Sequence, residues 1–380
     1  MIFKKIKNFF KNISLKKKKS NEKKYKIIPI FVPHLGCPED CVFCNQVKIA
    51  GAMPNIKIID AKNIIEEHLE SIEKRKDENT IIEIAFFGGS FTAIEENFQN
   101  ELLKLANEYI KADRVDGIRI STRPDKITKE ILQRLKKYNV TTIELGIQSS
   151  NDFVLKNARR GHDFKSVIEA SKLIRKYKIN FGAQMMIGLP GTTYKDEIKT
   201  AKDIIKLKPK MVRIYPTLVI KNTDLEDMYN KGEYIPLEIE EAVEVTAEIV
   251  KMFEDKKIDV IRVGLQTTEE ISNPKNKNSE VLAGPYHENF RELVEARIWY
   301  HRILEKILKM NVSIKEMTIT VNPRSASAVL GYKKENIKRF KKEYGIDVNV
   351  EYKTSLLLNE FELKIKEEEP FDIKIIGEKK

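Results

Sequence analysis

Between residues 26 and 216 the sequence alternates six times between a short β-branched run and a longer helical pattern. Several of the runs are apolar on both faces, which is typical of parallel strands covered by helices. Strand–helix units in succession predict a parallel sheet with right-handed crossovers. Six units are too few for a complete eight-stranded barrel, so we expect an α/β fold with a partial, open (βα)6 TIM-like barrel. The predicted strands are residues 26–32, 81–87, 117–122, 141–147, 181–187 and 211–216.

The rest of the pattern predicts the helices and a second, smaller module. The helices between the strands are predicted at 60–76, 95–111, 127–138, 164–177 and 193–206. After residue 216 the pattern predicts helices at 237–255 and 287–309, a strand at 312–321, short helices near 324–331 and 334–343, and strands at 346–352 and 361–367. We therefore expect three parts: an N-terminal arm (1–25), the barrel core (26–235) and a C-terminal α/β module (236–380).

The net charge of +12 belongs mainly to the N-terminal arm. Residues 1–30 hold eleven lysines and one acid, Glu22, a net of +10 that leaves +2 for the remaining 350 residues. The arm is interpreted as a solvated, disordered segment, as a source of phosphate affinity for RNA, or as a short helix at an anionic membrane surface. No apolar run approaches the ~20 residues that span a bilayer, and the first residues lack the pattern of a secretory signal.

All three cysteines lie within eight positions, as Cys37-x3-Cys41-x2-Cys44. Three thiolates this close can converge on one metal centre. One hypothesis is tetrahedral zinc, with His34 as the fourth ligand. The other is a [4Fe–4S] cluster held by three cysteines, which leaves one iron open to bind a small molecule. Unpaired cysteines fit a reducing, cytoplasmic compartment.

The segments at the carboxyl ends of the six predicted strands are rich in glycine and short polar residues. In a parallel barrel the active site collects at these carboxyl ends. Glycine there allows the backbone to approach a ligand closely. The segments are GCPEDCVFC, GGSFT, STRPD, GIQS, GLPG and YPT.

The cysteine segment, with Phe43 before its last cysteine, resembles the signature of the radical SAM superfamily. The resemblance implies a [4Fe–4S] cluster whose open iron binds S-adenosylmethionine (SAM). It also implies an enzyme that cleaves SAM to a 5′-deoxyadenosyl radical, in which the cofactors carry the difficult chemistry. The electron would come from a reducing partner such as flavodoxin or ferredoxin.

The resemblance also implies SAM contacts at the other strand ends. FFGGSFT resembles the family's glycine motif, so backbone groups of Gly88, Gly89 and Ser90 would take the SAM amino group. ELGIQSS resembles the ribose site, with Gln148 as the hydroxyl partner. Thr122, which ends the third strand, could also reach the ribose.

Two further segments complete the implied SAM site. NARRGH offers Arg160 as the partner of the SAM carboxylate, with Arg159 as the second choice, because a guanidinium matches a carboxylate in shape and charge. MIGLPG resembles the segment that packs on adenine, through Ile187 and the backbone of Gly188. Phe43 belongs to the same implied site.

Five motifs together are similar to the radical SAM region of the elongator protein 3 (Elp3) family. They are STRPDKI, ELGIQSS, VLKNARRGH, MMIGLPG and IYPTLVIKNTDLEDMYNKGEY, and the likeness covers residues 26–300. That family modifies wobble uridines of tRNA, so the resemblance implies a tRNA substrate. The chain departs from the family in its short cysteine spacing. Only 70 residues follow residue 310, without a glycine-rich acetyl-CoA loop, so we expect an Elp3-like enzyme without the acetyltransferase domain.

Three functions therefore stand as hypotheses. The first is a radical SAM enzyme acting on tRNA, which the lysine arm and the basic helix at 333–345 favour. The second is a radical SAM oxidoreductase acting on a small molecule such as a porphyrinogen. The third is a zinc-binding protein without enzymatic activity. Polar residues near the barrel mouth could serve either enzyme: Arg123, Asp125, Tyr215, Arg262, Tyr286 and His287.

Overall fold

The computed structural model describes residues 24–32, 41–45, 56–73, 79–268, 270–310 and 312–367. Residues 1–23 of the predicted arm lie outside this set, as do Cys37 and His34. The described residues divide into two compact units, one up to Arg291 and the other from Glu292. The domain boundary after residue 235 stays a prediction.

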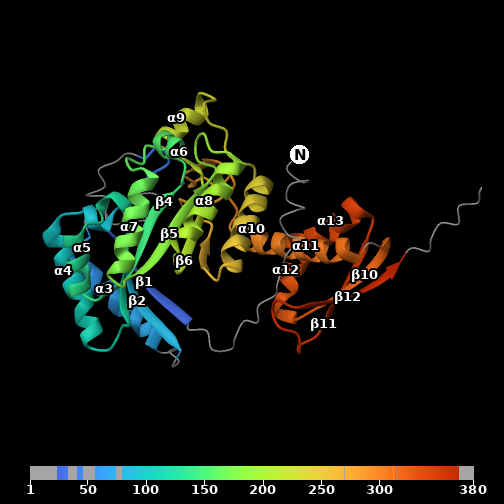
Figure 1. Cartoon of the computed structure of the whole chain (residues 1–380), viewed down its shortest axis with the longest axis horizontal. Coiled ribbons are helices and arrows are strands. Elements are labelled where there is room, and N and C mark those ends of the chain that lie inside the picture. The colour runs from blue at the N-terminus through green and yellow to red at the C-terminus, as the bar shows by residue number, and fades with distance from the viewer. Residues whose placement is uncertain are drawn as a thin grey trace, which may run out of the picture. The chain divides into compact units, whose positions relative to one another are not determined.

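A seven-stranded parallel sheet forms the centre of the first unit (Figure 1). Its strands are β1 (Lys24–Val32), β2 (Thr80–Gly88), β3 (Gly117–Thr122), β4 (Val140–Gln148), β5 (Asn180–Ile187), β6 (Met211–Pro216) and β8 (Asp259–Val263). They pair in the order β1-β2-β3-β4-β5-β6-β8, which leaves β1 and β8 as the two edges. The sheet is a curled, open half-barrel, which confirms the predicted fold class.

The seventh strand, β8, is the part of the sheet that the sequence pattern does not predict. A long excursion, residues 217–258, separates it from β6. Its residues alternate between exposed and half-buried, with only Val263 buried. Because β8 is an edge strand, it lacks the continuous apolar run that marks the central strands.

Helices cover the sheet, each packing on the strands beside it in sequence. They are α3 (Ile58–Glu73), α4 (Glu96–Lys111), α5 (Lys129–Lys137), α7 (Phe164–Lys176), α8 (Tyr194–Leu207) and α10 (Ile239–Asp255). Polar side chains fix where several of them begin: Thr128 caps α5, Asp163 caps α7, and Thr193 forms a capping box with Asp196 at α8. No helix in the described part of the chain is long and apolar enough to cross a membrane.

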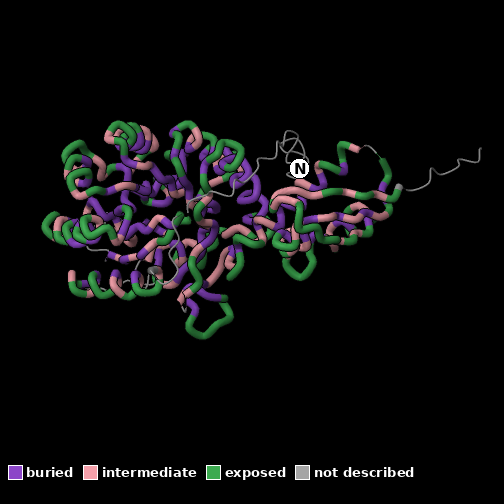
Figure 2. Tube along the Cα trace, turned by 90° about the horizontal axis from the view of Figure 1, so that it is seen from below, coloured by how far each residue is buried: buried purple, intermediate pink, exposed green. Residues whose placement is uncertain are grey.

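The two faces of the sheet differ in polarity. On β2, Ile82, Ile84 and Phe86 are fully buried on one face, and Glu83 lies on the other. Glu83 shares its face with Arg119, Glu144, Gln184 and Arg213 from β3 to β6, and we call this the polar face of the sheet. Figure 2 colours each residue by its burial and shows buried residues in both units.

Shorter elements complete the first unit near the carboxyl ends of the strands. They are α6 (Asp152–Asn157), α9 (Asp224–Asn230), and the antiparallel pair β7 (Val219–Ile220) and β9 (Val281–Ala283). Val219 and Leu225 pack together with Val42 of the cysteine segment. These elements therefore form part of the support for the cysteine segment.

The second unit is a two-layer α/β structure, which agrees with the predicted C-terminal module. Its elements are α11 (Phe290–Met310), β10 (Ile314–Val321), α12 (Ala326–Leu330), α13 (Glu335–Tyr344), β11 (Asp347–Tyr352) and β12 (Phe361–Glu367). The sheet order is β11-β10-β12. Its core joins Trp299 and Ile303 of α11 to Met317 and Ile319 of β10 and Phe340 of α13.

Candidate functional site

The cysteine segment is held between two short elements at the carboxyl edge of the sheet. The N–H of Val42 donates to the carbonyl of Ala158 at 3.3 Å, and the N–H of Leu225 donates to the carbonyl of Val42 at 2.8 Å. The N–H of Cys44 donates to the carbonyl of Cys41 at 2.9 Å, which closes a tight turn between the two cysteines. Cys41 is buried and Cys44 is half-buried, and neither forms a disulfide. Cys37 lies outside the described residues, so the three-ligand set stays a prediction.

Phe43, between the two cysteines, joins two apolar clusters. One contains Val219, Leu225 and Tyr234, and the other contains Val154, Ala158 and Leu189. Met186 of β5 packs against the second cluster as well, whereas its neighbour Ile187 is fully buried. Because successive strand residues face opposite ways, Met186 shares the side of β5 that Phe43 approaches. Sequence reasoning missed Met186, although it lies in the quoted MMIGLPG motif.

Arg160 lies beside the cysteine turn, where a helix-ending motif puts it. The N–H of Arg159 bonds to the carbonyl of Lys156 at 3.0 Å, and the N–H of Arg160 bonds to that of Leu155 at 2.9 Å. With Arg159 at φ +50°, this is the Schellman ending of α6, which turns the chain back on itself. Arg160 is 7% exposed, and its Nη1 donates to Cys41 Sγ at 3.2 Å.

The alternative arginine points elsewhere. The Arg159 side chain is 57% exposed and forms an ion pair with Asp224 at the start of α9. That pair contributes to holding α6 near α9. The geometry therefore favours Arg160 over Arg159 as the cation near the cysteines.

Gln148 lies next to Arg160, across Gly146. A β-bulge between β4 and β5 places Gln148 at φ +66°, and bulges commonly re-aim a side chain beside an active site. A Cβ atom at Gly146 would lie 3.1 Å from Arg160 Nη2 and 3.4 Å from Gln148 Nε2. Arg160 Nη2 donates to the Gly146 carbonyl at 2.9 Å. Glycine at 146 thus lets these two side chains approach the strand.

The polar atoms in this region are incompletely paired. Gln148 Oε1, Arg160 Nε, and both terminal nitrogens of Arg123 are buried and have no hydrogen-bond partner among the described residues. Arg123 is 3% exposed, and its Nε donates to Asp125 Oδ1 at 2.9 Å. Buried polar groups are rarely left unpaired in native proteins. One acceptor oxygen and three donor nitrogens in this region are therefore available to a polar ligand.

His162 is a further buried group that sequence reasoning missed, although NARRGH contains it. Its Nδ1 lies 3.2 Å from the Arg160 carbonyl, and its Nε2 is buried without a partner in the described structure. Burial and the positive charges of Arg160 and Arg123 lower the pKa of His162 to about 4, and Asp125 opposes them. His162 is therefore a neutral imidazole at pH 7.

Ser90 and Thr122 tie the ends of β2 and β3 together. Thr122 Oγ1 lies 2.8 Å from Ser90 Oγ and 2.6 Å from Thr92 Oγ1, and the N–H of Arg123 donates to Ser90 Oγ at 3.2 Å. Their hydroxyls are thus engaged with the protein itself, which leaves backbone groups as their route to a ligand. Gly88 has φ +111°, and a Cβ there would lie 2.3 Å from the Val32 carbonyl oxygen. Only glycine fits at that position.

Gly188, after β5, is fixed on both sides of its peptide. Its N–H donates to Glu197 Oε1 at 2.6 Å, and its carbonyl accepts from Tyr234 Oη at 2.6 Å. Gly188 has φ +73°, and a Cβ there would lie 3.2 Å from Leu237. Burial raises the pKa of Glu197 to about 7; the hydrogen bond from Gly188 opposes this shift, and the nearby Asp196 adds to it.

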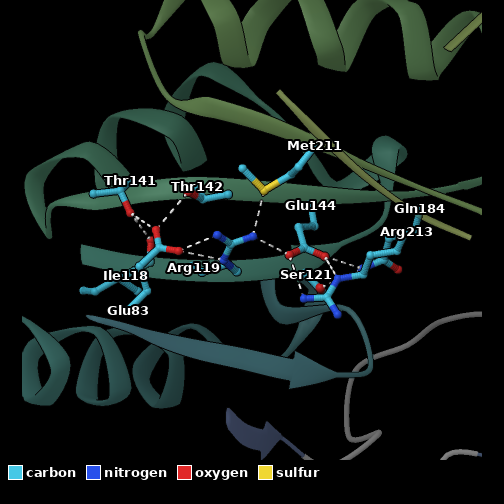
Figure 3. Close-up of polar contacts among 10 residues, drawn as sticks. All are labelled: Glu83, Ile118, Arg119, Ser121, Thr141, Thr142, Glu144, Gln184, Met211 and Arg213. Carbon is cyan, nitrogen blue, oxygen red and sulfur yellow. Dashed lines mark hydrogen bonds and ion pairs between the residues drawn. The ribbon is translucent and has the colours of Figure 1, made fainter. Parts of the chain in front are cut away.

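Figure 3 shows a chain of charges along the polar face of the sheet. Arg119, 2% exposed, donates from Nε to Glu83 at 2.9 Å and from Nη1 to Glu144 at 2.7 Å. Glu144 also accepts from Arg213 Nε at 2.6 Å and from Gln184 at 3.0 Å. Burial pushes the pKa of Glu144 upward, but Arg213 and Arg119 outweigh it, so the carboxylate is held ionised.

The predicted mouth residues fall into three groups. Arg123 and Asp125 form the pair described above. Tyr215 and Arg262 lie near Arg213. Burial acts to lower the pKa of Arg213, but Glu144 and Tyr215 outweigh burial and raise that pKa. Arg262 Nε donates to the Gly264 carbonyl at 3.2 Å, and burial and Arg213 lower the pKa of Arg262. Tyr286 and His287 make separate contacts, with Thr267 and the N–H of Asn289.

Comparison with known proteins decides the family. A model of the radical SAM superfamily matches residues 31–204, and a model of the radical SAM C-terminal domain matches residues 209–300. An uncharacterized protein of Methanocaldococcus jannaschii is 32% identical over 245 residues, which are 62% of this chain and 74% of that protein. The chain belongs to the radical SAM superfamily.

The radical SAM protein is also similar to Elp3 proteins. A tRNA uridine(34) acetyltransferase of Methanocaldococcus infernus is 32% identical over 198 residues, 47% of this chain and 37% of that enzyme. Human elongator complex protein 3 is 28% identical over 237 residues, 57% of this chain and 42% of that protein. A solved structure of M. infernus Elp3 with an N-terminal deletion has a TM-score of 0.57 and 25% identity, and covers 73% of this chain and 63% of that one. The chain spans less than two thirds of each.

The donor atoms of the radical SAM protein fit the cofactors that its superfamily implies. Two of the three predicted cysteine ligands lie on one tight turn beside a guanidinium. Around them, buried donors on Arg160 and Arg123 and a buried acceptor on Gln148 lack partners within the described residues. SAM carries a carboxylate for such donors and hydroxyls for such an acceptor. The residues therefore match both a cluster and SAM in chemistry.

Proposed function

We propose that this radical SAM enzyme holds a [4Fe–4S] cluster through Cys37, Cys41 and Cys44 and uses it to cleave SAM for the modification of tRNA. The chemistry that cluster and SAM supply together is reductive cleavage to methionine and a 5′-deoxyadenosyl radical. The observation that carries the proposal is the contact between Arg160 and Cys41, with unpaired buried atoms of Arg160 and Gln148 beside it.

The side chains have separate roles in this proposal. Arg160 binds the SAM carboxylate through its free Nε, while its Nη1 stays on the sulfur of Cys41. Gln148 Oε1 accepts from a ribose hydroxyl, and Thr122 holds the β2 and β3 ends in place for it. Backbone groups of Gly88, Gly89 and Ser90 bind the SAM amino group. Phe43 and the backbone of the segment Ile187–Gly188 enclose the adenine, because the Ile187 side chain is buried on the other side of β5 from Phe43.

The tRNA substrate is proposed from two sources. Relatives that share the radical SAM region are named tRNA uridine(34) acetyltransferases, and wobble uridine modification follows from that likeness. The lysine-rich residues 1–23 would add affinity for phosphate. A reducing cytoplasm, with flavodoxin or ferredoxin as electron donor, suits thiolate ligands.

Anaerobic purification tests the cluster. The protein is expected to be brown with about four irons per chain, and alanine at Cys37, Cys41 or Cys44 should remove both colour and SAM cleavage. A colourless protein with one bound zinc would contradict the proposal and favour the zinc hypothesis.

Reconstituted enzyme with dithionite and SAM then tests the substrate. Release of 5′-deoxyadenosine should rise with total tRNA and return to its basal level when the tRNA is first digested with ribonuclease. Stimulation by a porphyrinogen but not by tRNA would instead establish the small-molecule alternative.

Arg160→Gln tests the SAM carboxylate site. Loss of a hydrogen bond to a charged group costs about 1.5–3 kcal/mol, so the KM for SAM should rise about 10- to 100-fold. Arg159→Gln is the matched control, because that side chain is exposed and paired with Asp224, and it should change KM less than about threefold. Equal effects of the two substitutions would argue against Arg160 as the carboxylate partner. Iron content, measured in parallel, separates SAM binding from cluster loss.

A further inference from the structure

The connection between two strands of the second unit has an unusual form. β10 and β11 are adjacent and parallel, and the chain passes from one to the other through two helices, α12 and α13. β12 pairs antiparallel with the other edge of β10. Residues from α11, α12 and α13 share one core with the sheet. The result is a β-α-α-β unit with a third strand added, in which residues 331–334, here called the 331–334 loop, join the two helices.

The backbone of the 331–334 loop is strained. Gly331 has φ +74°, and Lys333 and Lys334 follow at φ +51° and +60°. A lysine side chain makes no local hydrogen bond that would offset the cost of the left-handed conformation. Two successive non-glycine residues in this conformation are rare. Such strain persists only where the surroundings impose it, and it clusters at ligand clamps and active sites.

Asn336, in the first turn of α13, anchors the loop. It is 3% exposed, and its Nδ2 donates to the carbonyls of Ala296 at 2.9 Å and Val329 at 3.0 Å. A Cβ at Gly331 would lie 3.2 Å from Asn336. The N–H of Lys334 donates to the Gly331 carbonyl at 3.0 Å. The loop is therefore fixed at its base, while its tip faces outward.

The tip of the 331–334 loop presents cations and an aromatic ring. Tyr332 is 48% exposed, and Lys333 and Lys334 are exposed beside it. Lys333 Nζ lies 5.1 Å from the centre of the Tyr332 ring. Neither lysine forms an ion pair with a carboxylate in the part of the chain that the structure describes, whereas the nearby Lys341 pairs with Asp347 at 2.8 Å. Unneutralised ammonium groups on a rigid turn are suited to bind phosphate.

We infer that the second unit is a binding module for single-stranded nucleic acid, and that the 331–334 loop clamps the sugar–phosphate backbone. KH modules use a four-residue loop with glycine at its first and fourth positions to hold four nucleotides of backbone. Gly331 takes the first position here. Lys334 takes the fourth and adopts the left-handed conformation that glycine favours. The inference stands apart from the SAM chemistry, because it concerns binding alone.

Fluorescence anisotropy with the full-length protein tests this inference without reductant, so that the outcome is independent of SAM cleavage. The probes are a labelled single-stranded RNA of about eight nucleotides, twice the four that such a loop holds, the DNA of the same sequence, and the RNA duplex. Single strands should bind more tightly than the duplex, and the RNA and DNA arms distinguish the two sources of the backbone.

Lys333→Glu/Lys334→Glu should weaken single-strand binding at least about tenfold, because it reverses two phosphate-facing charges. The matched control is Lys364→Glu/Lys366→Glu, the same charge change on β12, where Leu363 and Ile365 face the core and the lysines face away. This control should change affinity less than about threefold.

Lys334→Gly separates backbone geometry from charge. It restores glycine at the fourth position, so affinity should stay within about threefold of the wild type despite the lost charge. Far-UV circular dichroism checks that each variant is folded, and the milder Lys333→Ala replaces the double reversal if that variant unfolds. Tighter binding of the duplex, no binding of either single strand, or equal losses in the two double variants would overturn the inference.

Discussion

At the scale of single residues, unusual backbone conformations place the polar atoms of the candidate site. Gln148 and Arg159 have φ of +66° and +50°, in a region that few non-glycine residues occupy. The first places the Gln148 amide close to Gly146, as Arg160 is, and the second turns the chain so that Arg160 reaches Cys41. The motifs predict Gln148 and Arg160 as site residues. They do not predict these torsion angles, because a bulge and a helix ending depend on the neighbouring strand and helix.

Glu197 carries a pH dependence that can be measured. Its pKa of about 7 in the folded state lies above the ordinary value of 4.5, so the folded protein keeps this proton longer than the unfolded chain does. Stability from this group is therefore complete below about pH 4.5 and is lost as pH rises toward 7.

Between pH 4.5 and 7.5 the loss amounts to as much as about 3 kcal/mol. Glu197→Gln keeps an acceptor for the N–H of Gly188 and removes the titration. Urea unfolding of both proteins should show the wild-type free energy of unfolding falling relative to the variant over this pH range. Parallel curves would contradict the assignment.

At the scale of elements, the strands are linked twice, by backbone pairing and by side chains. Arg119 joins β2 to β4, and Arg213 joins β6 to β4, through Glu144. The strand GIRIST, residues 117–122, is predicted from its apolar residues. Its central arginine was a signal of a polar partner across the sheet, but the partners come from strands 25 to 36 positions away and no local pattern names them.

Arg119→Met is expected to destabilise the first unit by about 3–5 kcal/mol, because it leaves Glu83 and Glu144 buried with less compensating charge. Lys206→Ala, which removes an exposed pair with Asp203, is the control and should cost less than about 1 kcal/mol. Chemical unfolding measures both. A loss at Arg119 no larger than that of the control would contradict the importance of the charge chain.

Gly88→Ala tests the close approach of β1 and β2. The new Cβ would lie 2.3 Å from the Val32 carbonyl oxygen, in addition to the cost of a positive φ. Gly232→Ala shares the positive φ but has no atom within 4 Å, so it should cost only the backbone term of about 1–2 kcal/mol. Gly88→Ala should cost clearly more in thermal unfolding and should also lower iron content. Similar losses of thermal stability in the two variants would mean that β1 can move to accommodate the new Cβ at no further cost.

At the scale of the whole molecule, the sequence predicts the order of the elements better than their ends or additions. Six strands follow from apolar runs with turn residues after them, and the structure contains all six. The sequence pattern does not predict β8 or the pair β7–β9, because these strands are short or lie at an edge of the sheet. For the candidate site, the motifs predict Gln148, Arg160 and the cysteines, whereas His162 and Met186 become candidates only through the contacts that the structure gives them.

The distribution of charge gives a prediction for the full chain. Residues 1–23 carry nine lysines and one acid, a net of +8. Each phosphate contact contributes about 0.7–0.9 to the slope of log affinity against log salt. Removing residues 1–23 should make that slope for tRNA shallower by at least about 2, which corresponds to about three contacts. Replacing the nine lysines by glutamine is the matched control for length, and it should reproduce the effect. An unchanged slope would show that the arm does not contact RNA.

The chain of charges on the polar face also favours one register of the paired strands during folding. Strands β2 to β6 each contribute one member: Glu83, Arg119, Glu144, Gln184 and Arg213. A slip of one residue in any strand would turn its member to the other face, among side chains such as Ile84 and Ile120 that are fully buried. The free-energy cost of burying an unpaired charge in that layer would exceed the gain from apolar contacts. Misaligned half-barrels are therefore penalised before any cofactor binds.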